Sequence, residues 1–277
     1  EGSDETLAGY LRYPWTVWNS RLDRPYRKIV PAALRNVLRE SVGDSRWLGA
    51  AAQRKLRHTF LGRDGASWES FYFDNFYAAF SESEQRHLLV KELQPSPGAA
   101  YRDSLAFLDA STGPLLSRLL YTDIKTYLVE LCMKQDQMSM AASIESRVPF
   151  LDHSLVEFAL RIPSAMKTRG LTGKRILKAA VKDLLPASIR NRRKMGFPTP
   201  ISAWLAGWQL ETVEQILLEG RSLERGIFEP ESIRRLLAEH LLRRRDHSTK
   251  IWRLLNLELW HRVFIDRDSM LLEARAA

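Results

Sequence analysis

The chain has 277 residues, of which 45% are hydrophobic and 27% are charged, which is typical of a globular protein with a sizeable core. We expect one domain, or one domain with a helical appendage, and no apolar run is long enough to cross a bilayer, so the cytoplasm is the expected location. The formal net charge of +9 suits nucleic acid, an acidic membrane or a phosphate-bearing ligand, and does not choose among them.

The first ten residues predict a loop that leads into a helix. Ser3 can cap the helix, and Asp4 and Glu5 favour its positive end. Gly9 follows so early that it indicates close packing or a helix of only a few residues. From these residues alone, capping is the expected role of Ser3 and its two acidic neighbours.

Aromatic and arginine side chains are interleaved between residues 11 and 31. Such a pattern could stack on nucleic acid, but it is more typical of a surface helix packed by its rings, which we favour. Further helices are expected over residues 31–43, 47–61, 67–80, 82–93, 104–109 and 114–133, with a break at 95–98. Cys132, the only cysteine, ends the last of these, and it excludes a disulfide framework or a four-cysteine zinc site. It is expected to fill the core, because no local base would activate it.

Residues 139–152 have the sequence SMAASIESRVPFLD, in which two charged side chains stand in a small and apolar run. We expect this stretch to be buried, and buried charges are costly unless they are paired or contact a ligand. Glu145 and Arg147 therefore form either a structural ion pair or part of a binding site. The residues alone favour the ion pair.

A second candidate site lies at Gly170-Leu-Thr-Gly173-Lys174. A Walker A loop has four residues between its glycines and a Ser or Thr after the lysine, whereas here there are two and Arg175 follows, so the local signal is weak. Lys174 nevertheless precedes a helix with an apolar face, and anions bind well at a helix start. The plain alternative is a flexible surface lysine.

The rest of the C-terminal part is expected to be helical, over residues 154–162, 211–218, 230–242 and 250–264. Trp252 and Trp260 can share one core-facing side of the last helix. His153, next to Asp152, is expected to cap or pack rather than to act in acid-base catalysis. A basic run at residues 190–194 is typical of a solvated face.

Three segments, in order along the chain, closely resemble the asparagine synthetase family in its ATP-dependent synthetase domain. They are residues 136–152, residues 1–5 with Gly9 and Tyr10, and residues 174–197 from Lys174 to the Lys194-Met-Gly-Phe turn. Together they span nearly the whole chain. The resemblance is specific to the family and not to the substrate.

The resemblance implies roles for individual residues. Gly2, Ser3 and Asp4 would belong to a loop around the nucleotide phosphates, with Asp4 as a Mg²⁺ ligand and Glu1 as a catalytic carboxylate. Lys174 would contact the phosphates of ATP, with Arg175 as the nearest competing cation and Lys194 as a further contact. Glu145 would be a second catalytic carboxylate, and Arg147 would bind a substrate carboxylate or only pair with Glu145. The cofactors implied are ATP and Mg²⁺.

The resemblance also implies the fold and the reaction. Residues 1–277 would be the mainly α-helical, C-terminal portion of an α/β ATP pyrophosphatase-type synthetase domain, related to the adenine-nucleotide α-hydrolases, that lacks most of its parallel sheet. The domain would adenylate a carboxylate, aspartate first, and ammonia released from glutamine in an upstream glutaminase domain would form the amide. Relatives use this architecture for lactam formation and other amide transfers, and the sequence leaves these, and a homodimer, open.

The sequence also departs from the family pattern. It opens at Glu1, inside a motif, without the preceding strand and without the Ser-Gly-Gly-x-Asp-Ser phosphate loop, so we expect a fragment of a longer protein that is inactive alone. One alternative is a non-catalytic helical partner of a separately encoded ATP-binding chain, which burial of Trp252 and Trp260 inside this chain would disfavour and an exposed apolar face would support. A basic nucleic-acid-binding module ranks last, because the sequence has no recognised motif for it. No membrane partner is expected.

Overall fold

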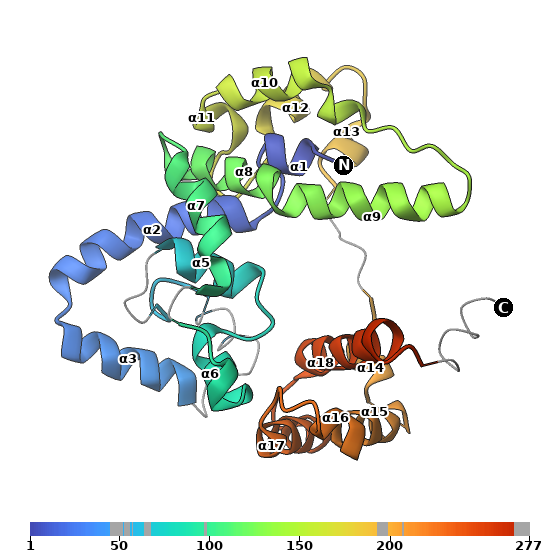
Figure 1. Ribbon diagram of the computed structural model, residues 1–277. Helices are drawn as coiled ribbons and strands as arrows, with labels where there is room; N and C mark the ends of the chain where they lie inside the picture. Colours follow the sequence, from blue (N-terminus) through green and yellow to red (C-terminus); the bar gives the residue numbers. More distant parts are fainter. Residues whose placement is uncertain are drawn as a thin grey trace. The chain divides into compact units, whose positions relative to one another are not determined.

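A computed structural model describes residues 1–44, 52, 56, 58–63, 68–96, 99–192, 199–206 and 208–268. These residues form helices and turns and contain no β-strand, only two isolated bridges (Figure 1). They divide into two compact units, Glu1–Phe76 with Tyr101–Lys194, and Tyr77–Ala100 with Met195–Ala277. None of the described helices is long and apolar enough to span a membrane.

The first unit is built around helix α8, Leu115–Lys125, which packs against α1, α2, α7 and α9. Its helices are α1 Ser3–Thr6, α2 Arg12–Ile29, α3 Ala32–Asp44, α5 Trp68–Phe76, α7 Arg102–Ala110, α8, α9 Tyr127–Ala141, α10 His153–Arg161, α11 Ser164–Lys167, α12 Arg175–Ala180 and α13 Ala187–Arg190. One-turn 3₁₀ helices at Ala99–Tyr101 and Pro149–Leu151 precede α7 and α10. The start of the chain therefore rests on the central helix of this unit.

A fully buried carboxylate fixes the centre of this unit. Asp123 on α8 accepts hydrogen bonds from Arg12 Nη2 at 2.8 Å, from the hydroxyl of Tyr72 at 3.2 Å and from the hydroxyl of Tyr13. The Arg12 guanidinium also lies over the ring of Tyr10, at 4.2 Å from its centroid. Arg12 and Tyr13 at the start of α2 thus pack inside the unit, as expected for a ring-packed helix, whereas Trp18, Arg21 and Arg24 are exposed.

The single helix expected over residues 114–133 is in fact two. The chain breaks at Thr126, whose backbone (φ −122°, ψ −79°) is not helical, and α9 then continues to Ala141. The Thr126 hydroxyl donates to the carbonyl of Thr122 at 2.8 Å. A β-branched hydroxyl side chain that bonds one turn back bends helices, which explains why apolar spacing alone missed the break.

The second unit packs α15, Trp208–Leu218, α17, Pro230–Leu241, and α18, Ser248–Trp260, around a common apolar core. The remaining elements are α6 Glu82–Leu88, the 3₁₀ turn Lys91–Leu93, α14 Ile201–Trp204, α16 Gly220–Leu223 and the π-helical turn His261–Ile265. Glu258, buried in α18, pairs with Arg225 at 2.7 Å and with Arg262 at 2.8 Å, which ties the end of α18 to the loop between α16 and α17.

Most expected helices are present with shifted ends. The segments expected at 67–80, 104–109, 154–162 and 230–242 correspond to α5, α7, α10 and α17. Most of the helix expected at 47–61 lies outside the described residues. Trp252 packs against the core of its unit, whereas Trp260 is 48% exposed, so the shared core-facing side holds for the first tryptophan only.

Candidate active site

Lys174 lies against the first helix of the chain. Its ammonium group, Nζ, is 2.8 Å from Ser3 Oγ and 3.0 Å from Asp4 Oδ2. Its backbone N–H donates to the carbonyl of Leu7 at 3.1 Å, so both the main chain and the side chain are held. Lys174 and Asp4 keep about a fifth of their side-chain surface exposed, at 22% and 21%. The structure thus joins two of the three segments that resemble the family; we call Ser3, Asp4 and Lys174 the Lys174 cluster.

Two glycines allow this close approach. A Cβ atom on Gly9 would lie 2.0 Å from Asp4 Oδ1 and 2.2 Å from Lys174 Cε, and one on Gly173 would lie 2.0 Å from the carbonyl oxygen of Ala8. Lys174 itself has a left-handed backbone, φ 53°, at the start of α12, a conformation that non-glycine residues rarely adopt. Strained backbone of this kind persists where the surroundings enforce it, and it occurs often at functional sites.

Gly9→Ala should therefore displace the Lys174 cluster. The added methyl group overlaps Asp4 Oδ1 and Lys174 Cε, and because both are far ends of flexible side chains that can move aside, we expect the free energy of unfolding to fall by about 1 kcal/mol, the lower end of the usual cost of overpacking. Urea unfolding of Gly9→Ala beside Gly220→Ala tests this, because the nearest atom to a Cβ on Gly220 is 3.7 Å away. Equal stability of the two variants would show that the approach at Gly9 is not tight.

Gly2 connects the start of the chain with the third segment. It precedes α1 with φ +92°, and a Cβ there would lie 2.2 Å from Leu151 Cδ2, in the 3₁₀ turn that ends residues 139–152. Glu1 is exposed. Burial of the Cys132 thiol is the largest cause that raises its pKa, and the negative charge of the Glu1 carboxylate is the second. A raised thiol pKa agrees with the expectation that Cys132 is no nucleophile. Glu1 and Gly2 therefore lie beside α9 and residues 149–151.

The sequence interpretation missed the environment of Glu5. Its side chain is fully buried, its Oε1 accepts the Tyr10 hydroxyl at 2.8 Å, and its Oε2 has no partner among the described residues. Burial raises the pKa of Glu5, and the hydrogen bond from Tyr10 opposes that rise. The sequence around Glu5 gives no sign of this burial, because a buried acidic residue at a helix start looks the same in sequence as an exposed one. Its place in the Glu1–Glu5 motif was the only signal that drew attention to Glu5.

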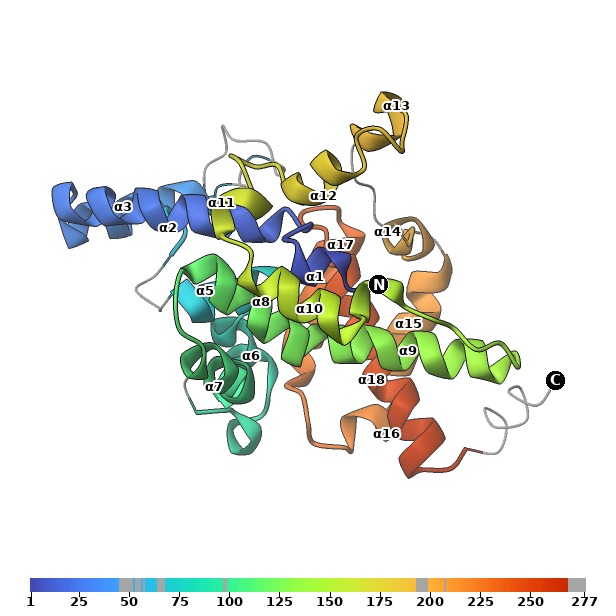
Figure 2. The same cartoon turned by 90° about the horizontal axis from the view of Figure 1, so that it is seen from above.

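Glu145 and Arg147 are not buried, which corrects the expectation for residues 139–152. They form a 2.7 Å ion pair with side chains that are 66% and 80% exposed. After α9 the chain turns at Ser143, φ 58°, and runs back to α10 as a separate loop (Figures 1 and 2), so the burial argument does not apply to it. An open cavity of about 530 Å³ adjoins this loop, lined by Asp136, Met140, Ser143 and Glu145. No described contact joins the pair to the Lys174 cluster.

Of the other two predicted phosphate-binding cations, Arg175 and Lys194, the structure describes only Arg175. The Arg175 guanidinium donates to the carbonyl of Ala165 at 2.9 Å, on α11 rather than toward Asp4. Lys194 lies outside the described residues, so its predicted phosphate contact stays a prediction. In the part of the chain that is described, no three His, Cys, Asp or Glu side chains gather as a metal site. The predicted role of Asp4 as a Mg²⁺ ligand therefore stays a prediction.

A second lysine of this unit behaves differently. Lys167 on α11 is 1% exposed, and burial lowers its pKa from 10.5 to about 8. Between these two pH values the Lys167 side chain is protonated in the unfolded chain and neutral in the folded one. The free energy of unfolding should therefore rise as the pH increases from about 8 toward 10.5.

Lys167→Met should remove that rise and stabilise the protein below pH 8 by roughly 1–3 kcal/mol, the cost of burying a polar group. Urea unfolding at both ends of this pH range provides the test, with the exposed Lys182→Met as control. A stability of the Lys167 variant that still climbs with pH would mean that another group titrates.

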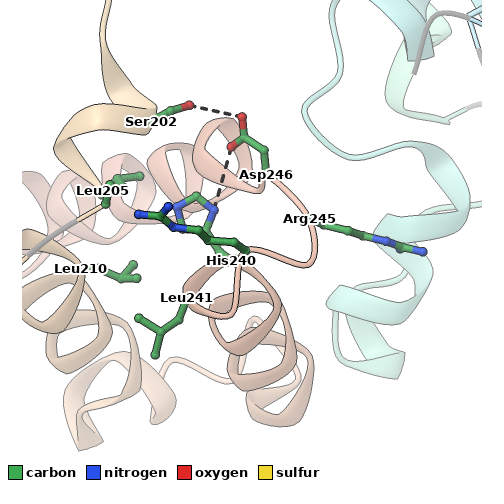
Figure 3. Close-up of a pocket in the computed structure, with 9 residues that line it drawn as sticks. Ser202, Leu205, Leu210, His240, Leu241, Arg245 and Asp246 are labelled. Carbon is green, nitrogen blue, oxygen red and sulfur yellow. Dashed lines mark hydrogen bonds and ion pairs between the residues drawn. The ribbon is translucent and has the colours of Figure 1, made fainter. Parts of the chain in front are cut away.

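The second unit contains a separate cavity of about 220 Å³ (Figure 3). Ser202 Oγ donates to Asp246 Oδ2 at 3.3 Å, and Nδ1 of His240 lies 3.9 Å from Asp246 Oδ1 and accepts the N–H of His247 at 3.1 Å. The carboxylate stands between hydroxyl and imidazole, so the histidine has no direct path to the serine proton, which a nucleophilic triad requires. None of the predicted site residues lines this cavity.

Comparison with known proteins agrees with the resemblance in the sequence. The family model described as asparagine synthase matches residues 1–262. The glutamine-hydrolyzing asparagine synthetase 1 of Bacillus subtilis is 30% identical to this chain, and the match covers 98% of this chain and 40% of the relative. The amidase chyE of Penicillium rubens is 26% identical, and the match covers 78% of this chain and 34% of the relative. The chain thus spans less than half the length of these curated relatives. No solved structure matches it significantly. The chain belongs to the asparagine synthase family.

Proposed function

We propose that this chain is the C-terminal portion of a synthetase domain that uses ATP to turn a carboxylate, with aspartate as the first candidate, into an amide. ATP activates the carboxylate as an acyl-adenylate and pyrophosphate leaves; ammonia derived from glutamine then attacks the acyl carbon. The observation that carries the proposal is the Lys174 cluster, where an ammonium group meets a hydroxyl 171 residues away and a carboxylate 170 residues away along the chain. Membership of the family supports the same reaction class.

Lys174 can stabilise the charge that adenylation develops. Attack of the carboxylate oxygen on the α-phosphorus breaks the bond to the β-phosphate, and negative charge accumulates on the departing pyrophosphate. An ammonium held in place by Ser3 and by its own strained backbone needs little reorganisation to meet that charge. The partial exposure of the cluster leaves it open to phosphate oxygens. Gly2 and Ser3 would contribute further contacts to these oxygens.

Asp4 is the residue that would hold Mg²⁺. Magnesium in ATP-using enzymes takes one or two protein carboxylates and completes its shell with substrate phosphates and water, so one partly exposed carboxylate fits this mode. The bound ion would neutralise charge on the phosphates. Asp4 forms an ion pair with Lys174, and both side chains can turn toward the triphosphate because this ion pair is only partly buried.

Glu1 is our candidate for the amide-forming step. The nitrogen of ammonia forms a bond to the acyl carbon, the bond from that carbon to the AMP oxygen breaks, and the nitrogen loses one proton. An exposed carboxylate beside α9 can position ammonia and accept that proton. Glu145 ranks lower, because it is paired with Arg147 on an exposed loop, and Arg147 could still bind the substrate carboxylate. Arg175 and Lys194 remain lower-ranked phosphate contacts.

The parallel sheet and the Gly-rich phosphate loop would have to come from outside residues 1–277. The same holds for the glutaminase domain that releases ammonia. We therefore expect the chain alone to release no pyrophosphate above background when given ATP, Mg²⁺, aspartate and ammonia. A colorimetric pyrophosphate assay checks this, and turnover by the chain alone would overturn the idea that its phosphate loop is supplied elsewhere.

A second candidate function has its own supporting observation. Large apolar side chains on α9 and α10 are exposed, as expected of a helical partner for a separately encoded ATP-binding chain. Packing of the partly buried Trp252 against the core of its own unit counts against this candidate, whereas exposure of Trp260 favours it. An amidotransferase or lactam-forming synthetase is a third, narrower alternative, since the relative from Penicillium rubens is named an amidase.

Carboxylate-dependent pyrophosphate release by the complete protein tests the reaction class. Aspartate should stimulate release well above the rate with ATP alone, and glutamate, one methylene longer, serves as the matched control substrate. Stimulation by another carboxylate but not by aspartate would move the protein to a related synthetase. Pyrophosphate release that no carboxylate stimulates would contradict the proposed function.

A further inference from the structure

Tyr10 takes no part in the reaction proposed above, yet it makes the hydrogen bond that holds Glu5. Its hydroxyl donates to Glu5 Oε1 at 2.8 Å. Glu5 is fully buried and its Oε2 has no partner among the described residues, so the hydroxyl of Tyr10 offsets the burial of this carboxylate. Burial and, next, the hydrogen bond to Glu5 raise the pKa of Tyr10, so the phenol keeps its proton and stays the donor.

The position of α1 depends on contacts of this kind. Glu5 lies on α1, the same helix that carries Ser3 and Asp4. A helix of four residues has too few internal hydrogen bonds to be stable by itself, and its N-cap residue, Gly2, has no side chain to cap it. The hydrogen bond from Tyr10 therefore helps to fix where Ser3 and Asp4 lie.

Tyr10 is in turn anchored to the centre of the first unit. The Arg12 guanidinium lies over its ring at 4.2 Å from the centroid, and over the ring of Tyr127 on α9 at 4.7 Å. The rings of Tyr10 and Tyr127 meet edge to face, with centroids 6.0 Å apart. Arg12 pairs with Asp123, the fully buried carboxylate of α8. A guanidinium that contacts two rings and a buried carboxylate leaves Tyr10 little freedom to move.

The exact placement of α1 matters for the chemistry of the Lys174 cluster. A preorganised ammonium group stabilises developing charge without reorganisation, and a misplacement of about 1 Å can cost roughly 100-fold in rate. Helix α1 supplies Ser3 and Asp4, and the backbone N–H of Lys174 donates to the carbonyl of Leu7 at the end of α1. A shift of α1 would therefore disturb all three members of the cluster.

We propose that Tyr10 is a positioning residue of the adenylation site. Through Glu5 it holds α1 on the central helix of the unit, so that the Lys174 cluster meets the phosphates of ATP in the reactive geometry. Tyr10 itself touches no reacting atom. The inference rests on the proposed function and adds a residue for which that function alone has no use.

Tyr10→Phe in the complete protein removes the hydroxyl and keeps the ring beneath Arg12. Tyr13→Phe is the matched control, because it also takes a tyrosine hydroxyl from a buried carboxylate, that of Asp123, which is not on α1. Both variants should lose a similar amount of stability in urea unfolding. Only Tyr10→Phe should lower kcat for aspartate-dependent pyrophosphate release, by roughly 10-fold to 100-fold.

A double-mutant cycle with Lys174→Met separates positioning from a general loss of structure. If Tyr10 acts through the Lys174 cluster, adding Tyr10→Phe to Lys174→Met should change kcat by less than about threefold, because the two losses are not additive. The same fall in kcat in both backgrounds, an unchanged kcat in Tyr10→Phe, or an equal fall in Tyr13→Phe would overturn the inference.

Binding of a non-cleavable ATP analogue gives a measurement that needs no turnover. Isothermal titration calorimetry with α,β-methylene-ATP and Mg²⁺ should show roughly tenfold weaker binding in Tyr10→Phe and unchanged binding in Tyr13→Phe, because groups that must first be reordered contribute less affinity. Equal affinities of the two variants would overturn the inference. Weaker binding in Tyr10→Phe alone, in a protein whose pyrophosphate release no carboxylate stimulates, would retain the positioning role and reject the proposed function.

Discussion

Replacing Lys174 with alanine in the complete protein is expected to lower aspartate-dependent pyrophosphate release by roughly 100-fold to 1,000-fold, the usual cost of losing one preorganised charge contact. The ammonium of Lys174 is the cation of the cluster, 2.8 Å from Ser3 Oγ and 3.0 Å from Asp4 Oδ2. Stability should change little, since the ion pair is partly exposed. A continuous pyrophosphate assay at saturating ATP measures the rate.

Two further variants separate charge from packing. Lys182→Ala removes an exposed lysine of the same unit and should leave the rate unchanged. Lys174→Met keeps most of the side-chain length without the charge and should be as slow as Lys174→Ala. Near-normal release by both Lys174 variants would remove the main catalytic assignment, and recovery by methionine alone would reduce Lys174 to a packing residue.

The largest effect on stability is expected at Asp123. Removing this fully buried carboxylate in Asp123→Ala leaves the Arg12 guanidinium and two tyrosine hydroxyls without their common acceptor. Breaking a buried charge pair on one side typically costs about 3–5 kcal/mol, so we expect the first unit to be partly unfolded at ambient temperature. Urea unfolding followed by far-ultraviolet circular dichroism gives the free energy.

Asp109→Ala is the matched control for that variant. Asp109 lies on α7 with a side chain that is 76% exposed, and it pairs with Arg118 at 3.3 Å. Exposed pairs contribute about 0–1 kcal/mol, so this change should be nearly neutral. Similar losses in the two variants would show that the buried network is not what holds the unit together.

The sequence predicted the helices better than their ends and breaks. Apolar spacing identified α17 and α18, because both bury one side in the same core. It missed the break at Thr126, where one hydroxyl competes with the helix for the carbonyl of Thr122. Burial of residues 139–152 was wrong because small apolar residues say nothing about whether a partner surface is present in the same chain.

The residues of the candidate site were predicted from the family resemblance more than from local sequence patterns. No spacing rule joins Ser3 and Asp4 to Lys174, and the glycine pattern around Lys174 was a poor match to a Walker loop. Gly9 was the exception, since its early position indicated the close packing that the structure has. Glu5 escaped notice because its burial follows from tertiary contacts with the rest of the first unit.

The fate of oxygen tests the central claim most directly. The complete protein would be given aspartate with both side-chain carboxylate oxygens replaced by a heavy isotope, together with ATP and glutamine, and AMP and inorganic phosphate would be analysed by mass spectrometry. If the carboxylate is adenylated, one labelled oxygen must remain on AMP after ammonia displaces it, and we predict that result. Label in inorganic phosphate, or an AMP without label, would contradict the acyl-adenylate and with it the role assigned to Lys174.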